Sequence, residues 1–177
     1  MCNEPVDRMV GAPVHARSLA ALAAMVALTG CGGGSRPAPS SQGGGQWTAN
    51  AAGVIDELQR DVLLSTSGGS TLASARRALH DQQSLFTILV AYTDFGGCGH
   101  MLAAIGAPPA AFAKVERTLE AACTMFQRAT ALFTRATTAS DPHALLAATR
   151  LALNAYPLLV RAKDDLDAAQ ATLTSNT

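Results

Sequence analysis

The stretch FAKVERTLEAACTMFQRATALF, residues 112–133, decides the fold class of this chain. Apolar residues recur in it every three or four positions, which is the spacing of one face of an α-helix. From Asn50 onward the chain has no alternating apolar and polar run of the kind that predicts a half-buried strand. We therefore expect a long helix that begins after Pro108-Pro109. Its core side carries Phe112, Val115, Leu119, Ala122, Phe126, Ala129 and Phe133.

The same spacing predicts two helices before this one. The first runs from about Ala51 to Ser65 and ends at Gly68-Gly69. The second begins near Thr71 and ends at Gly96-Gly97, because glycine disfavours a helix interior. Its core stripe is expected to contain Leu72, Ala75, Leu79, Phe86 and Leu89, widened by Leu85, Ile88 and Tyr92.

A last long helix is predicted from Asp141-Pro142 to about Leu173. Asp141 is a good N-cap acceptor, and proline suits the first helical position. Pro157 lies inside this helix and is expected to bend it after Leu153. A short extra helix fits residues 98–105. Four amphipathic segments with short connections predict an all-α fold, an antiparallel four-helix bundle, over residues 50–177.

The N-terminal region has the features of a targeting segment. His15 and Arg17 precede the uncharged run LAALAAMVALT, residues 19–29. This run is too short to span a membrane but has the length of a signal-peptide core. The residues that follow, Leu28-Thr29-Gly30-Cys31, resemble the lipobox of bacterial lipoproteins. The resemblance implies a signal peptide over residues 1–30, cleavage after Gly30, and acylation of the Cys31 thiol.

A buried N-terminal helix with a chance cysteine is the alternative, and the glycine tract after Cys31 argues against it. Glu4 and Asp7 are unusual in the leader of a signal peptide. Translation from Met9 would instead leave the conventional basic leader MVGAPVHAR. Residues 31–49, which contain GGGSRPAPSSQGGGQ, have the composition of a flexible linker.

Lipid on Cys31 would anchor the chain to a membrane without spanning it. We therefore expect a location in the bacterial cell envelope, facing outside the cytoplasm. Trp47 opens the folded part, where it either caps the bundle, the interpretation we favour, or touches lipid headgroups. The 13 basic and 13 acidic residues balance, so no electrostatic attraction to nucleic acid is expected.

Cysteine usage points to one disulfide. Cys2 belongs to the signal peptide and Cys31 to the anchor, which leaves Cys98 and Cys123. Outside the cytoplasm an isolated pair of this kind predicts a disulfide. The alternative is a soft-metal site made of these two cysteines with His100 and Met101. We favour the disulfide, because the adjacent His100 and Met101 would point about 100° apart on a helix and a disulfide would consume both thiolates. We expect no metal and no cofactor.

The other polar residues give no catalytic set, so we do not expect an enzyme. His80 and His143 are interpreted as solvated side chains. Asp164, Asp165 and Asp167 form an acidic cluster that is either a solvated face or a contact for a cation or a basic partner. Glu116 and Glu120 are one helical turn apart, but the Glu-x-x-His pairs of a di-metal bundle are missing.

Two functions remain. The first is a non-enzymatic lipoprotein whose helical domain binds another envelope protein or supports the envelope. The alternative is a carrier of an apolar ligand or lipid in the bundle core. A large exposed apolar patch would favour the first, and an apolar cavity of several hundred Å³ the second. The carrier's cavity would be lined by the methionines and by Phe86, Phe95, Phe112, Phe126 and Phe133.

Overall fold

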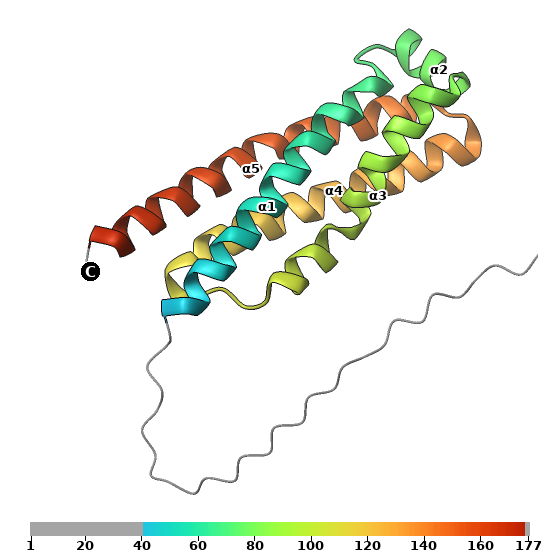
Figure 1. Ribbon diagram of the computed structural model, residues 1–177. Coiled ribbons are helices and arrows are strands. Elements are labelled where there is room, and N and C mark those ends of the chain that lie inside the picture. Colours follow the sequence, from blue (N-terminus) through green and yellow to red (C-terminus); the bar gives the residue numbers. More distant parts are fainter. Residues whose placement is uncertain (1–40, 176–177) are drawn as a thin grey trace, which may run out of the picture. The chain divides into compact units, whose positions relative to one another are not determined.

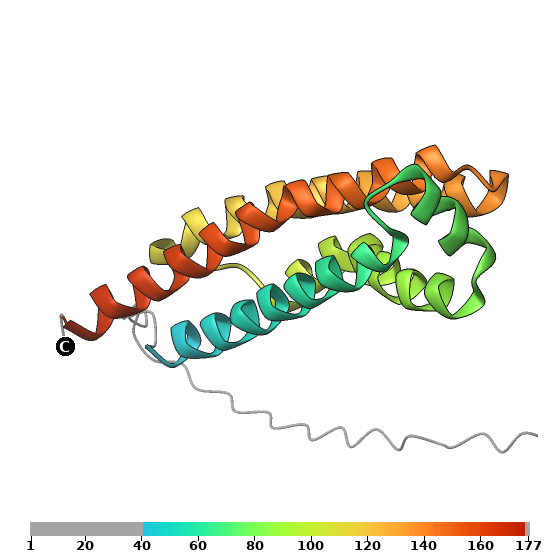
Figure 2. The same ribbon diagram turned by 90° about the horizontal axis from the view of Figure 1, so that it is seen from above.

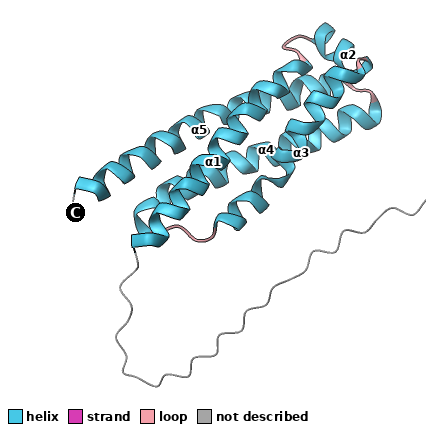
Figure 3. Cartoon of the chain, in the orientation of Figure 1, coloured by secondary structure: helices cyan, strands magenta, loops and turns pink. Residues whose placement is uncertain are grey.

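The computed structural model describes residues 41–175, and these residues form helices with no strand among them (Figure 3). The predicted signal peptide (residues 1–30), Cys31 and the linker up to residue 40 lie outside the described residues. The long helices are α1 (Ser41–Ser65), α3 (Gln82–Ile105), α4 (Ala113–Ala139) and α5 (Pro142–Ser175), and a shorter helix is α2 (Leu72–His80). Single turns of 3-10 helix, η1 (Thr66–Gly68) and η2 (Ala110–Phe112), follow α1 and precede α4.

The four long helices form the bundle, and each runs antiparallel to the next one along the chain (Figure 1, Figure 2). α1 packs against α3 and α5, and α4 packs against the same two helices from the other side. α2 lies at the end where α1 turns back into α3, in contact with α3 and α5. The predicted all-α antiparallel bundle with a short extra helix is confirmed, although the extra helix is α2 and not residues 98–105.

α1 begins ten residues earlier than the spacing of apolar residues predicts, at Ser41 instead of Ala51. The reason is Trp47, whose side chain is 3% exposed. Its indole Nε1 donates a hydrogen bond to the Gly106 carbonyl at 3.0 Å, and its ring stacks on Phe112 at 5.4 Å between centroids. Burial of a tryptophan can hold residues of low helix propensity in a helix. Trp47 therefore caps the bundle, and the linker prediction is wrong for residues 41–49.

The predicted second helix is two helices, because the chain breaks at Asp81. Asp81 has an extended backbone, and its carboxylate accepts the Ser84 amide at 2.9 Å, which caps α3. Thr71 and Ser74 form a capping box at the start of α2. The break changes the register of the core stripe. Phe86 and Leu89, predicted to be buried, are 68% and 48% exposed.

α3 also continues through Gly96-Gly97, where the sequence predicts its end. Residues 98–105 are therefore the last turns of α3 and not a separate helix. Residues of α3 that enter the core are Ile88, Ala91, Tyr92, Phe95 and Cys98.

α4 and α5 agree closely with the prediction. All seven residues predicted for the core side of the third helix are buried. The Asp141 carboxylate accepts the amides of His143 at 2.9 Å and Ala144 at 3.2 Å, which makes it the N-cap of α5. Pro157 lies inside α5, as expected, and the helix continues to Ser175.

Candidate functional site

Cys98 in α3 and Cys123 in α4 are joined as a disulfide, with their Cα atoms 5.5 Å apart. Both are buried, at 0% and 4% exposure. The structure therefore brings together the two cysteines that sequence reasoning paired. Since Cys98 lies inside α3, the bond crosslinks two long helices, whereas we expected it to hold an irregular segment.

Glycines next to Cys98 allow α3 and α4 to approach closely. A Cβ atom at Gly99 would lie 3.3 Å from the Gln127 side-chain nitrogen, and one at Gly96 would lie 3.4 Å from the Thr130 methyl group. The Thr130 hydroxyl lies 3.1 Å from the Tyr92 carbonyl across the same contact. These glycines therefore serve helix packing, which explains why they do not end α3.

The alternative metal site has no donors left in the cysteines, because both sulfur atoms belong to the disulfide. His100 is exposed and Met101 is half-buried. Within residues 41–175 no group of three or more histidine, cysteine or carboxylate side chains is arranged to hold a metal ion.

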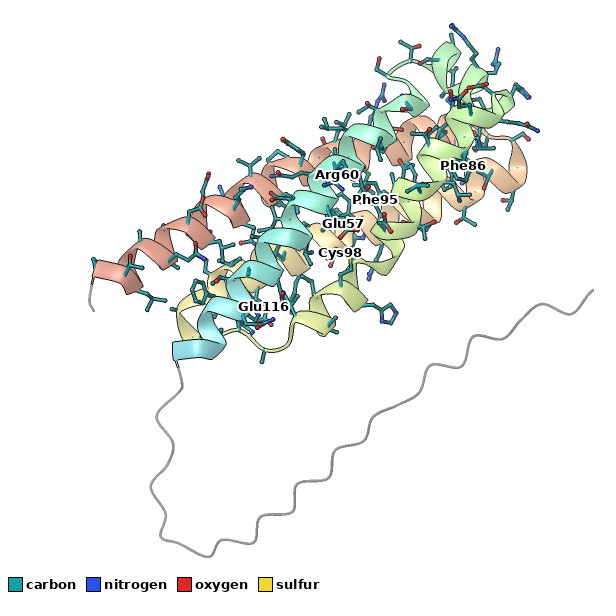
Figure 4. The ribbon with its side chains drawn as sticks, viewed as in Figure 1. Glu57, Arg60, Phe86, Phe95, Cys98 and Glu116 are labelled. Atoms are coloured by element: carbon teal, nitrogen blue, oxygen red, sulfur yellow. A yellow bond between two sulfur atoms is a disulfide. The ribbon has the colours of Figure 1, made fainter. Side chains whose placement is uncertain are left out.

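A cleft of about 590 Å³ opens beside the disulfide, between α3, the first half of α4 and the start of α1. Sequence reasoning did not find it, because it depends on how three distant segments pack. Its only charged lining residues are Glu116 and Glu120, and Glu116 is labelled in Figure 4. The lining consists of Trp47, Gly99, Leu102, Ala103, Ile105, Gly106, Ala107, Glu116, Leu119, Glu120, Cys123, Thr124 and Gln127.

The phenylalanines expected to line a carrier's cavity pack against one another instead. Phe95 stacks on Phe126 with ring centroids 4.3 Å apart, and Phe133 stacks on Tyr92 at 4.4 Å. Phe112 packs on Trp47, and Phe86 is on the surface. The bundle core is therefore filled by its aromatic rings where the carrier hypothesis placed a ligand.

Asp61 of α1 is a buried carboxyl group that the sequence analysis missed, with 3% exposure. Its Oδ2 atom has no hydrogen-bond partner. Burial, followed by the nearby carboxyls of Asp94 and Glu57, raises its pKa to about 6, and Arg60 opposes this shift (Glu57 and Arg60 are labelled in Figure 4). Its burial could have been predicted from the sequence, because Asp61 lies at helical spacing from the apolar residues Val54 and Leu58 and so falls on the same side of the helix.

The remaining predicted polar residues lie on the surface. His80, His143, Asp164 and Asp167 are exposed. Asp165, from the acidic cluster, pairs with Lys114 of α4 at 2.8 Å. Exposed pairs of this kind contribute little to stability. The acidic cluster is therefore divided between one interhelical ion pair and solvated carboxylates.

The outer side of α3 carries an exposed apolar patch, which we call the α3 patch: Phe86, Leu89 and Val90, exposed by 68%, 48% and 42%. Spacings of three and four residues place them on one side of the helix. Asp94 is the only Asp, Glu, Lys or Arg residue in α3. Among the described helices, α3 alone is long and apolar enough to cross a membrane, and only 28% of its most apolar window is buried.

Comparison with known proteins adds no relative: no family model, curated protein or solved structure matches the chain.

Proposed function

We propose that this protein is a lipid-anchored lipoprotein of the bacterial envelope whose helical domain binds another protein. The lipobox and the linker of the sequence support the anchor. The α3 patch is the observation that carries the binding function. A phenylalanine that is 68% exposed next to two exposed aliphatic side chains is a common feature of protein interaction sites. The domain acts by binding and not by catalysis.

The carrier hypothesis, in its core-cavity form, has less support, because the phenylalanines stack on one another. The patch is separate from the cleft, since none of its three residues lines that cleft. Figure 4 shows the same separation along the bundle, with Phe86 near α2 and Glu116 toward the opposite end. A partner on the α3 patch therefore leaves the cleft open.

Substituting Phe86 tests the binding function. Phe86→Ser is expected to weaken partner binding about 30-fold or more, as loss of an aromatic anchor costs about 2 kcal/mol or more. Stability should change by no more than about 0.5 kcal/mol, because the side chain is on the surface. A photo-crosslinking amino acid at position 86 in native envelopes identifies the partner, and its affinity for the purified variant is then measured.

Leu153, 41% exposed and on α5 instead of α3, is the matched control. Leu153→Ser should keep full binding, and a crosslinker at position 153 should not capture the partner. If position 86 gives no crosslinked protein, or Phe86→Ser binds the partner as the wild type does, the α3 patch is not a binding surface.

The anchor has its own test. Cys31→Ser is expected to abolish incorporation of a fatty-acid analogue and to leave the protein unprocessed or released from membranes, since the thiol is the acylation site implied by the lipobox. Metabolic labelling and membrane fractionation measure both effects. Cys2→Ser, within the predicted signal peptide, should label as the wild type does. The anchor is ruled out if the wild type incorporates no fatty-acid analogue and Cys31→Ser fractionates with membranes as the wild type does.

A further inference from the structure

The cleft beside the disulfide combines an apolar floor with two acidic groups. Its apolar floor consists of Trp47 and Leu119, which are buried, and of Leu102 and Ile105, which are half-buried. Its volume of about 590 Å³ lies within the range of about 300–1,000 Å³ typical of small-molecule sites. The floor is thus suited to the apolar body of a small molecule.

The charges of the cleft have one sign. Glu116 and Glu120 are four residues apart on α4, so they lie on the same side of the helix, where like charges destabilise each other. Neither glutamate forms an ion pair within the described part of the chain. Among residues 41–175, no lysine, arginine or histidine lines the cleft: Lys114 is paired with Asp165, and Arg117, next to Glu116 in the sequence, is outside the lining. The cleft therefore lacks a positive group of its own to balance the two carboxylates.

We propose that this cleft binds a cationic amphiphile, a small molecule with an apolar body and an ammonium group, through Glu116 and Glu120 above the floor of Leu102, Ile105 and Leu119. A positive ammonium group between the two carboxylates offsets their mutual repulsion by Coulombic attraction to both. The apolar body covers the floor and displaces water from it. An anionic amphiphile meets two like charges, and a neutral one leaves both carboxylates without a counter-charge.

The single tryptophan of the chain makes the proposal directly measurable. Trp47 lines the cleft, so a bromine atom bound there quenches the only indole fluorescence. The probes are 11-bromoundecyltrimethylammonium, 11-bromoundecanol and 11-bromoundecanoate, used below their micellar concentrations. The protein is the full chain with Cys31→Ser, oxidised, so that no acyl chain on this cysteine competes.

The cationic probe is expected to bind at least tenfold more tightly than the anionic one, with the neutral probe between them. The double variant Glu116→Gln with Glu120→Gln should bind the cationic probe at least tenfold more weakly and should bind the neutral probe as the wild type does. The control is Asp164→Asn with Asp167→Asn, which removes two exposed charges of α5 outside the cleft and should change nothing. Circular dichroism verifies the fold of each variant.

Three results would overturn the proposal: no quenching by any probe, equal binding of all three probes, or glutamine variants that bind the cation as the wild type does. The proposal would also be overturned if Asp164→Asn with Asp167→Asn weakened binding of the cationic probe as much as the two glutamine substitutions do. Phe86→Ser should bind all three probes normally, which separates this site from the α3 patch.

Discussion

Removing the Cys98–Cys123 bond is expected to lower the free energy of unfolding by about 2–4 kcal/mol. The bond closes a loop with a sequence separation of 25 residues, and the chain-entropy model gives about 3–4 kcal/mol for a loop of this size. The change is made by reduction, or by Cys98→Ser with Cys123→Ser. Chemical denaturation of the oxidised, reduced and double-serine proteins measures the loss.

The effect should be strongest in the last turns of α3. Gly96, Gly97 and Gly99 lie within this part of the helix, and each glycine costs about 1 kcal/mol relative to alanine in a helix interior. The disulfide holds the segment against α4 despite this low propensity. After reduction, amide hydrogen exchange should accelerate first in residues 96–105, while α4 and α5 remain protected.

Reductant should have no effect on the double-serine protein, which is the internal control. Peptide mapping of native protein without reductant should yield one crosslinked pair of peptides that contain Cys98 and Cys123. Two free thiols in quenched native protein would contradict the disulfide. An unchanged free energy of unfolding after verified reduction would contradict its stabilising role.

The parts of the fold that the sequence predicted well are those determined by local signals. α4 has a regular apolar stripe and α5 has an aspartate–proline start, and both signals act within one or two turns. The capping role of Trp47 also followed from its position at the start of the folded part. The signals in α4 and α5 do not depend on which helix packs against which, whereas the contacts that Trp47 makes with Gly106 and Phe112 do.

Two of the wrong predictions involve contacts between distant segments, and the third, at Phe86, involves a local break in the helix. Gly96-Gly97 predicted a helix end, but close packing of α3 on α4 outweighs the propensity of glycine. A glycine-rich segment precedes Trp47 in α1, and burial of the indole against Gly106 and Phe112 keeps this segment helical. Phe86 was assigned to the core because the break at Asp81 left no clear signal in the apolar pattern.

The candidate sites follow the same division. Cys98 and Cys123 could be paired by elimination, since only two cysteines remain after residue 31. The cleft could not be predicted, because α1, α3 and α4 each contribute part of its wall. The burial of Asp61 could have been predicted but was overlooked, since this aspartate shares one side of a helix with Val54 and Leu58.

The buried carboxyl of Asp61 should make the wild type less stable at neutral than at mildly acidic pH. Its pKa is about 6 in the folded protein and about 3.9 in an unfolded chain, so the folded state holds the proton more tightly. The stabilisation that the folded state gains by holding this proton is fully present below about pH 4 and is lost as the pH rises through 6. Denaturation curves between pH 4 and pH 7.5 measure the decline.

Asp61→Asn should therefore raise the free energy of unfolding at pH 7.5 by about 2–3 kcal/mol, the value of a pKa difference of about two units. The amide is neutral at every pH, so it removes the repulsion with Asp94 and Glu57 that helps to raise the pKa of Asp61. At pH 4 the variant and the wild type should be equally stable. Asp164→Asn, at an exposed position, should change neither value. An equal gain at both pH values, or none at pH 7.5, would show that no buried negative charge at Asp61 opposes folding.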